Sequence, residues 1–248
     1  MTIGIMCAMQ EEINLLHKDI KNASVTTIAG RNFYCGELYG KKAVLVMSRI
    51  GKVAAAITAT LLLEHFHVDA LVFAGTAGGV DPALNVGDVV VASHSVQHDF
   101  AVPGEPFRIP MLDISYLESD KALTDTVFGA VSKYAENDMV NEIDPEFLEK
   151  FHIEKPKALL GTVASGDQFI CEKSKNTWLY ENVNNIKCVE MEGAAVAQVC
   201  YEWGAPFTII RVISDSANDS SSVDFNLFIE KAASYFTRGM VRAFMPLI

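Results

Sequence analysis

Eight short apolar runs rich in β-branched residues recur along the chain, and they constrain its fold more than any other feature. Such runs, bounded by turn residues, are typical of β-strands. Between several of them lie Ala- and Leu-rich stretches with helical spacing, at 52–66, 193–203 and 225–245. Strands that alternate with helices predict an α/β fold of three layers, α/β/α, around a central sheet. The apolar runs are residues 2–8, 25–30, 42–48, 69–75, 87–93, 158–165, 186–191 and 207–214.

The second run and the segment FYCGELYG at 33–40 are separated only by Arg31 and Asn32. This spacing predicts an antiparallel hairpin and therefore a mixed sheet. Residues 103–157 are the least regular part, rich in Pro and charge, with one helical stretch near 118–135. We expect a long insertion or lid there. Because no repeat, low-complexity tract or linker is visible, we expect a single domain over residues 1–248.

Charge and cysteine content exclude several classes of function. The chain has 20 Lys and Arg against 31 Asp and Glu, a net charge of -11, and no basic run, so it would repel nucleic acid. Its five cysteines form no C-x-x-C pair and no metal-ligand spacing with His, which predicts reduced core thiols and no metal site. No basic amino-terminal region precedes an apolar signal and no apolar run is long enough for a membrane span, so we expect a cytoplasmic protein.

Polar groups follow four of the predicted strands, in AMQEE (8–12), AGTAGG (74–79), VEMEG (189–193) and RVISDSAN (211–218). Ligands of α/β sheets bind at the carboxyl ends of the strands. The sequence therefore predicts one crevice in which four side chains converge: Glu12, Thr76, Glu192 and Asp215.

Each candidate also has a purely structural interpretation. Glu12 is typical of a solvated first helical turn, and Asp215 of a capped turn after a strand. A salt bridge to Arg211 accounts for either Glu190 or Glu192. His98 beside Asp99 fits a polar loop contact better than a catalytic pair, and three further residues fit the core as well as a pocket: Met9, Phe169 and Met191.

The four motifs above occur in order along the chain with two further segments, SRIGKVAAA (48–56) and SGDQFI (165–170). Together the six segments closely resemble the bacterial 5'-methylthioadenosine/S-adenosylhomocysteine nucleosidases, part of the wider nucleoside phosphorylase family. The E-M-E and S-D signatures belong to the wider family, whereas the A-M-x-x-E start is more specific to the nucleosidases. Within these segments, Cys7 stands where glycine is more usual and Thr76 where serine is common. The segments are GIMCAMQEE (4–12), SRIGKVAAA (48–56), AGTAGG (74–79), SGDQFI (165–170), VEMEGAAVA (189–197) and RVISDSA (211–217).

The resemblance implies a nucleoside phosphorylase-like fold and a hydrolase that needs no cofactor. Glu12 would activate a water that Thr76 and Arg211 help to hold, and Asp215, oriented by Ser214, would donate a proton to N7 of adenine. Departure of the base leaves oxocarbenium character on the sugar, so the reaction needs an acid at the base and a carboxylate near the attacking water. Asp215 suits this role only with a raised pKa, whereas Glu12 must stay ionised.

The remaining roles concern binding of the nucleoside. Phe169 would stack on the purine while the Ile170 backbone reads its edge. Glu192 would accept hydrogen bonds from the ribose 2'- and 3'-hydroxyls, with Met191 against the sugar. A thioether tail is uncharged and suits an apolar slot. The resemblance implies that four residues line this slot: Met9, Ile50, Val102 and Phe225.

Three alternatives remain open at this stage. The first is a purine nucleoside phosphorylase, which uses phosphate as the nucleophile. The resemblance implies that phosphorylases have an arginine where this chain has Phe73, and its absence favours water as the nucleophile. Arg49, however, replaces a small residue near the sugar end and could bind phosphate, so a phosphorylase stays open. An aminofutalosine nucleosidase differs only in the 5'-slot. A non-catalytic nucleoside-binding protein would not need the acid and base.

The family resemblance and the broadly apolar segment 52–66 also predict a homodimer, with residues near Val102 approaching the partner's pocket.

Overall fold

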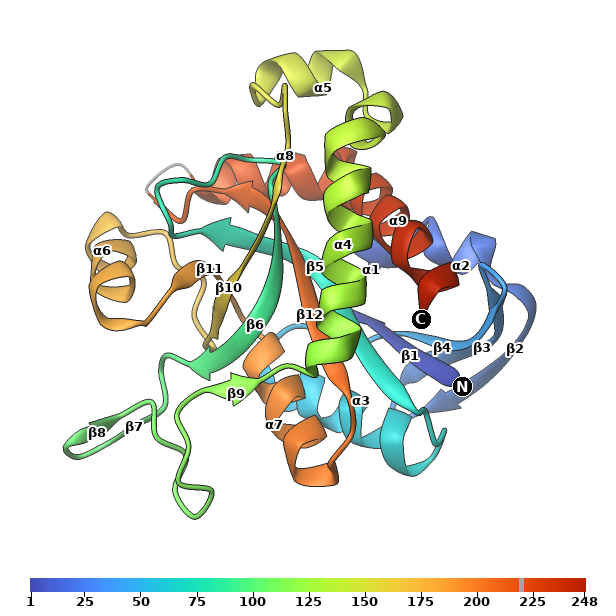
Figure 1. Ribbon diagram of the computed structural model, residues 1–248, viewed down its shortest axis with the longest axis horizontal. Helices are drawn as coiled ribbons and strands as arrows, with labels where there is room; N and C mark the ends of the chain where they lie inside the picture. Colours follow the sequence, from blue (N-terminus) through green and yellow to red (C-terminus); the bar gives the residue numbers. More distant parts are fainter. Residues whose placement is uncertain (219–220) are drawn as a thin grey trace.

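One mixed β-sheet runs through the middle of the molecule (Figure 1). The structure is a computed structural model, and it describes residues 1–218 and 221–248. In these residues ten strands pair in the order β11-β10-β6-β12-β5-β1-β4-β3-β2, with β9 beside β6. The strands of this sheet are β1 (Thr2–Cys7), β2 (Lys21–Ile28), β3 (Arg31–Leu38), β4 (Lys41–Met47), β5 (Ala70–Gly79), β6 (Val89–Gln97), β9 (Leu117–Glu118), β10 (Ala158–Ser165), β11 (Ile186–Glu190) and β12 (Phe207–Asp215).

The sheet contains two parallel sets of strands that run in opposite directions. Strands β4, β1, β5 and β12 form one set, and β6, β10 and β11 form the other, because β12 pairs antiparallel with β6. The sets meet a second time where Cys188 and Val189 of β11 pair antiparallel with Gly79 and Gly78 of β5. This second pairing brings carboxyl ends from both sets to one place.

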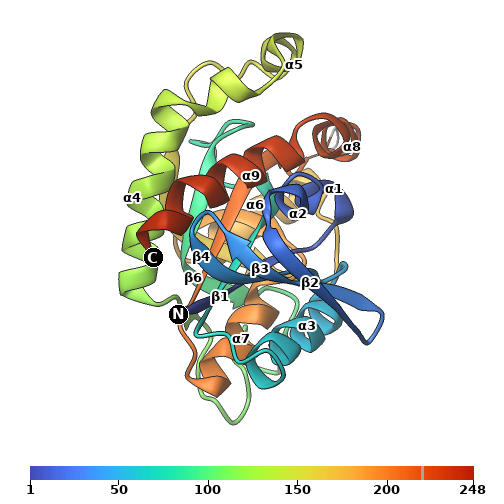
Figure 2. The ribbon, with the colours of Figure 1, turned by 90° about the vertical axis from the view of Figure 1, so that its right-hand side faces the viewer.

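Helices cover both faces of the sheet (Figures 1 and 2). Helices α4 and α9 pack together on one face, with α1, α2 and α8, and α3 packs against α7 on the other. The predicted three-layer α/β/α fold with a mixed sheet is therefore confirmed. The helices are α1 (Gln10–Ile13), α2 (Leu16–Asp19), α3 (Lys52–Glu64), α4 (Lys121–Asn137), η1 (Met139–Glu142), α5 (Pro145–Lys150), α6 (Lys173–Asn182), α7 (Gly193–Trp203), α8 (Ser221–Lys231), α9 (Ala233–Phe244) and η2 (Met245–Leu247).

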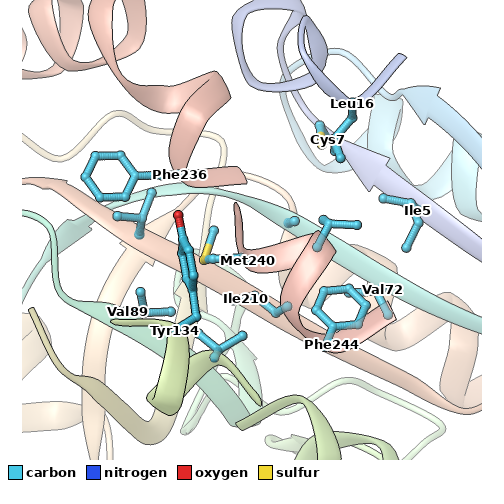
Figure 3. Close-up of a cluster of buried hydrophobic side chains, with 14 of the residues drawn as sticks. Ile5, Cys7, Leu16, Val72, Val89, Tyr134, Ile210, Phe236, Met240 and Phe244 are labelled. Carbon is cyan, nitrogen blue, oxygen red and sulfur yellow. The ribbon is translucent and has the colours of Figure 1, made fainter. Parts of the chain in front are cut away.

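Alternate side chains of the central strands enter two different apolar clusters. Val72 of β5 packs in the cluster with α4 and α9, where Tyr134 and Met240 lie (Figure 3). The next residue, Phe73, faces the cluster on the side of α3 and α7 with Ala59. Because side chains of a strand point to opposite faces in turn, a strand covered on both faces must be apolar throughout, which explains the uninterrupted runs in the sequence.

The β2–β3 hairpin is confirmed, but its turn lies two residues earlier than predicted. Ile28 pairs with Arg31, so the turn residues are Ala29 and Gly30, with φ of 49° and 69°. Positive φ at both positions is the geometry of a type I' turn. Arg31 instead starts β3 and is buried, and its Nε donates to the carbonyl oxygen of Ser48 at 3.2 Å.

Within residues 103–157 the helical stretch predicted near 118–135 is confirmed as α4, and this helix packs on the core instead of forming part of a lid. Helix α4 begins after Asp120, whose side chain accepts a hydrogen bond from the Leu123 backbone, and its inner face is buried in the core. Most of the irregular part lies before α4. It adjoins the hairpin of β7 (Ala101–Val102) and β8 (Glu105–Pro106), which projects from the body of the molecule (Figure 1). The predicted helix at 225–245 is two helices, α8 and α9, that meet at Ala232.

In the described ranges, 1–218 and 221–248, no helix combines the length and apolarity needed to cross a membrane.

Two glycines in helices provide a test of the packing between α4 and α9. A methyl group on Gly239 would lie 1.8 Å from the Tyr134 hydroxyl, whereas one on the exposed Gly129 meets nothing within 4 Å. We expect Gly239→Ala to lower the free energy of unfolding by about 1–3 kcal/mol through overpacking. The control Gly129→Ala should raise it by up to about 1 kcal/mol. Urea denaturation of both variants measures the difference, and equal midpoints would contradict this packing.

Candidate active site

A cavity opens where the two sets of strands meet. Its walls come from the carboxyl-terminal residues of β5, β11 and β12, from the segments that follow β1, β4, β10 and β11, and from α8. The predicted convergence at one crevice is therefore observed, although it depends on two opposed sets of strands rather than one open sheet. The described residues that line it are Ala8, Met9, Glu12, Ile50, Thr76, Ala77, Gly78, Gln168, Phe169, Ile170, Val189, Glu190, Met191, Glu192, Ser214, Asp215 and Phe225.

Glu12 is a buried carboxylate that accepts four hydrogen bonds, not a solvated first-turn residue. Its side chain reaches back past its own helix terminus, where Oε2 accepts from the backbone N–H groups of Ala8 (2.9 Å) and Met9 (3.0 Å). Oε1 accepts from the backbone N–H (2.9 Å) and hydroxyl (3.1 Å) of Thr76. Burial raises the pKa of Glu12, and Arg211 together with these hydrogen bonds opposes the rise.

In the glycine cluster at the end of β5, Gly75 lies where a side chain would clash with Glu12. A Cβ atom at this position would lie 2.7 Å from Glu12 Oε1. The absence of a side chain therefore lets the carboxylate approach the strand closely enough to meet the Thr76 N–H. Glycines at a strand end allow a ligand to approach the backbone closely. At Gly75 the group that lies against the backbone is the carboxylate of Glu12, not a ligand.

Glu190 and Arg211 form a buried ion pair beneath the cavity. Arg211 Nη2 lies 2.5 Å from Glu190 Oε2, and their side chains are 1% and 4% exposed. Glu190 also accepts from the Ser165 hydroxyl and from the backbone N–H groups of Glu192 and Gly193. The structural interpretation of one carboxylate as the partner of Arg211 is thus confirmed for Glu190.

Glu192 occupies the N-cap position of α7 and is 5% exposed. Its Oε1 accepts from the backbone N–H of Gly51 at 2.8 Å. Burial, and after it the nearby charge of Glu190, raise the pKa of Glu192 to about 8. A carboxylate with few partners of its own is well placed to accept hydrogen bonds from a polar ligand.

Asp215 ends β12 and is 2% exposed. The Ser214 hydroxyl lies 2.8 Å from its Oδ2, and the backbone N–H of Ala217 donates to its Oδ1 at 2.9 Å. Gly78 lies against this carboxylate, since a Cβ there would be 3.0 Å from Oδ1. The hydrogen bonds from Ser214 and Ala217 fix the orientation of the Asp215 carboxyl group in the cavity wall.

The rest of the cavity wall includes aromatic and apolar side chains. The rings of Phe169 and Phe225 meet edge to face, with centroids 5.3 Å apart and planes at 65°. Phe169 is 42% exposed and Ile50 is 55% exposed, whereas Ile170 is buried. An exposed aromatic ring at a cavity mouth is available to stack on a planar ligand, so Phe169 is not a core residue.

Two predicted site residues do not line the cavity. Val102 lies on the projecting β7 strand. Arg211 donates through Nη1 to the carbonyl oxygens of Phe73 and Ile210 and through Nη2 to Glu190, so it supports the cavity wall from below rather than facing the cavity. Conversely, Glu190 lines the cavity, although the sequence did not predict it there. Its position two residues before Glu192, at the end of the same strand, is the signal that could have indicated it.

The three residues at unusual positions in the family motifs have ordinary structural roles. Cys7 is fully buried in the cluster beside α9 (Figure 3). Thr76 keeps the hydroxyl that meets Glu12. Arg49 is exposed, and its Nη2 donates to the carbonyl oxygen of Gly30 at 2.7 Å, so its guanidinium is directed to the hairpin turn and is not part of the cavity wall.

The charged groups of the cavity all have the same sign. Among the described lining residues, Glu12, Glu190, Glu192 and Asp215 are carboxylates, and none is Lys, Arg or His. Such a site favours neutral or cationic ligands over anions. In the described part of the chain, no group of three or more His, Cys, Asp and Glu residues is arranged to hold a metal ion.

A model of the phosphorylase superfamily matches residues 2–245. The chain belongs to the phosphorylase superfamily. Within it, the 5'-methylthioadenosine/S-adenosylhomocysteine nucleosidase of Shewanella halifaxensis is 36% identical over 237 residues, which cover 95% of each chain. The family indicated by the sequence motifs is therefore confirmed.

Solved structures of the phosphorylase superfamily also match the whole chain. The nucleosidase of the same name from Neisseria meningitidis, in complex with methylthio-immucillin-A, has a TM-score of 0.87 at 30% identity and covers 100% of this chain and 99% of its own. The futalosine hydrolase of Helicobacter pylori has a TM-score of 0.82 at 29% identity, covering 99% of this chain and 98% of its own.

The raised pKa of Glu192 predicts how stability depends on pH. The folded state binds this proton more tightly than the unfolded chain, so the stabilisation is present below the ordinary pKa of 4.5 and is lost as pH rises to about 8. Between roughly pH 5 and pH 9, the free energy of unfolding of wild type should fall by about a few kcal/mol relative to that of Glu192→Gln, because one pKa unit corresponds to about 1.4 kcal/mol. Chemical denaturation across this pH range tests it. The exposed Glu64→Gln is the control and should show a constant difference from wild type.

Proposed function

We propose that this chain hydrolyses the N-glycosidic bond of 5'-methylthioadenosine and S-adenosylhomocysteine and releases adenine and the thioribose product. The observation that carries the proposal is the meeting of Glu12, Glu192 and Asp215 in one cavity that aromatic and apolar side chains also line. Nucleosidases that match almost the full length of the chain support it.

Glu12 is the general base in this proposal. A carboxylate with a raised pKa takes a proton from water more readily than an ordinary one, provided that it is ionised at the working pH. The hydrogen bonds from Thr76, Ala8 and Met9 fix its orientation and favour the ionised form. A water at the cavity side of Glu12 is then activated for attack on the anomeric carbon.

Asp215 is the general acid that protonates N7 of the departing adenine. The Ser214 hydroxyl and the Ala217 N–H orient its carboxyl group. The acid acts in the transition state, when negative charge develops on the base, so its loss affects turnover more than binding.

The remaining walls suit the rest of the nucleoside. Glu192 accepts hydrogen bonds from the ribose 2'- and 3'-hydroxyls, Met191 packs on the sugar, and Phe169 stacks on the purine beside the Ile170 backbone. The 5'-alkylthio group lies against Met9, Ile50 and Phe225. This assignment is consistent with the position of these residues around a single cavity.

The electrostatics favour water over phosphate as the nucleophile. A phosphate dianion would enter a cavity whose charged lining residues are all carboxylates. At the position where the resemblance implies an arginine in the phosphorylases, Phe73 is fully buried. A phosphorylase thus lacks its anion site here, and the intact acid and base count against a purely nucleoside-binding protein.

Two candidate substrates remain to be compared, because a futalosine hydrolase is also a full-length structural neighbour. The two activities differ in the group that enters the 5'-slot. Comparing kcat/KM for methylthioadenosine and for aminofutalosine decides between them, and a preference for the second would replace the substrate proposed here.

We also propose that the chain acts as a homodimer in the cytoplasm. Helix α3 buries Ala55, Ala59 and Leu62 in the core, yet it exposes Val53 (71%) and Ile57 (42%) on the opposite side. An apolar surface on a helix that is already packed on its inner face is suited to a second copy. In such a dimer the projecting β7 strand, with Val102, approaches the partner's cavity. Light scattering that shows a fully active monomer at assay concentration would contradict this assembly.

Phosphate dependence tests the hydrolytic reaction directly. We expect adenine release from methylthioadenosine at the same rate in phosphate-free buffer and at high phosphate, without added metal or nucleotide. Labelled oxygen from H₂¹⁸O should appear on the anomeric carbon of the sugar product. A 1-phosphate sugar as the main product would establish a phosphorylase instead.

Replacement of the proposed acid gives a second test. Asp215→Asn should lower kcat by at least about two orders of magnitude while the substrate still binds, as expected for a group used in the transition state. The same substitution at Asp125, an exposed residue paired with Lys121 on α4, is the matched control and should leave kcat unchanged. Near-normal turnover of Asp215→Asn would exclude it as the proton donor.

A further inference from the structure

Lys52, the first residue of α3, lies in a polar cluster next to the cavity. Its Nζ lies 2.5 Å from Asp99 Oδ1 and donates to Gln97 Oε1 at 3.3 Å. The Lys52 and Asp99 side chains are only 16% and 18% exposed. Neither residue lines the cavity. A largely buried ion pair beside a site, without contact to the ligand space, requires a structural reason.

Both members of the pair also bind the loop that follows β10. The backbone N–H of Asp167 donates to Asp99 Oδ2, and the backbone N–H of Lys52 donates to Asp167 Oδ1, both at 2.8 Å. Phe169 and Ile170, the proposed purine contacts, follow Asp167 by two and three residues. We call residues 166–170 the purine loop.

The same helix terminus contacts the ribose side of the site. Gly51, immediately before Lys52, donates its N–H to Glu192 Oε1 at 2.8 Å. Its φ of 96° favours glycine, and a Cβ there would lie 3.1 Å from Asp167 Oδ1. Residues 51 and 52 therefore connect the ribose carboxylate to the purine loop through consecutive backbone N–H groups.

Close packing holds the loop against the other side of the cluster. A Cβ on Gly166 would lie 2.4 Å from His98 Nε2 and 3.0 Å from Asp99 Cγ. Burial raises the pKa of Asp99, but the hydrogen bonds from Lys52 and the Asp167 N–H outweigh it and hold this pKa below its usual value. The carboxylate thus stays ionised and able to accept both bonds at neutral pH.

We infer that Lys52 and Asp99 are positioning residues that fix the purine loop relative to Glu192, and so set the distance between the purine and ribose contacts. The inference rests on the proposed function for the identity of those contacts. The ammonium neutralises Asp99 and aligns its second oxygen with the Asp167 N–H. Without the ammonium, the bond from the Lys52 backbone N–H to Asp167 remains, but Asp99 is no longer held in line with the Asp167 N–H, so the loop loses its side-chain attachment to α3.

Kinetics with methylthioadenosine test this role in Lys52→Met, Asp99→Asn and the double variant. Misplacement of a substrate by about 1 Å can cost about 100-fold in rate, so we expect kcat/KM of each single variant to fall by at least about 10-fold. Because the two residues act as one unit, the double variant should be little worse than either single one. Lys52→Arg, which keeps the charge, should recover most of the activity. Lys121→Met breaks an exposed ion pair on α4 and is the control.

A fluorescence measurement reports on the loop independently of turnover. Trp178 lines a second cavity together with Gln168 and Ile170 of the loop, and the chain has one other tryptophan, Trp203. In a Trp203→Phe background, acrylamide quenching of Trp178 should increase in Lys52→Met and Asp99→Asn but not in Lys52→Arg or Lys121→Met. A general loss of stability would lower the melting temperature without this selective change in the folded protein.

The outcomes separate the inference from the proposed function. If wild type releases adenine, and Lys52→Met and Asp99→Asn are folded with unchanged kcat/KM and quenching, the positioning role is wrong and the nucleosidase stands. If wild type releases no adenine, the proposed function is wrong, and the quenching series still decides whether the pair holds the loop. Should Lys52→Met not fold, Asp99→Asn decides alone. Additive losses in the double variant would contradict action as one unit.

Discussion

The ion pair between Glu190 and Arg211 is the interaction on which the rest of the site depends. It joins the end of β11 to β12, while the Ser165 hydroxyl brings in β10 and the Gly193 N–H brings in the start of α7. Moving two charges out of water costs several kcal/mol per ion, which the attraction between them offsets only when further hydrogen bonds complete the geometry. Here the carboxylate receives donors from three other residues, and the guanidinium donates to the carbonyl oxygens of Phe73 and Ile210.

This ion pair also sets the electrostatics of the cavity above it. Arg211 lowers the pKa of Glu12 against the larger effect of burial, whereas Glu190 adds to burial in raising the pKa of Glu192. Arg211 lowers the pKa of Glu192 as well, so the difference between the two carboxylates lies in their other partners. The proposed base is bound by four donors, and Glu192 is left with capacity for a ligand.

Local patterns are enough to predict the strands, α7 and the strand ends that carry Glu12, Thr76, Glu192 and Asp215, because apolar runs and the polar residues after them are properties of short segments. They do not reveal the turn at Ala29, since alanine rarely adopts positive φ. The contact between Gly75 and Glu12 joins residues 63 positions apart and depends on how β1 and β5 pair. The pairing of β11 with β5 is likewise non-local. The helical period near 118–135 predicts α4, whereas the charge and proline elsewhere in residues 103–157 leave no period from which α5 could be predicted, so that part of the sequence suggests a lid.

Phe73 links the identity of the nucleophile to the ion pair. Its ring centroid lies 4.1 Å from Arg211 Cζ, so the aromatic face meets the guanidinium directly. Such a contact stabilises a buried cation without adding charge. An arginine placed at residue 73 would bring a second cation against Arg211, which Glu190 alone would have to neutralise. The position therefore cannot supply a phosphate site in this chain without rebuilding the pair beneath it, and a neutral nucleophile is the one that this arrangement of charges accommodates.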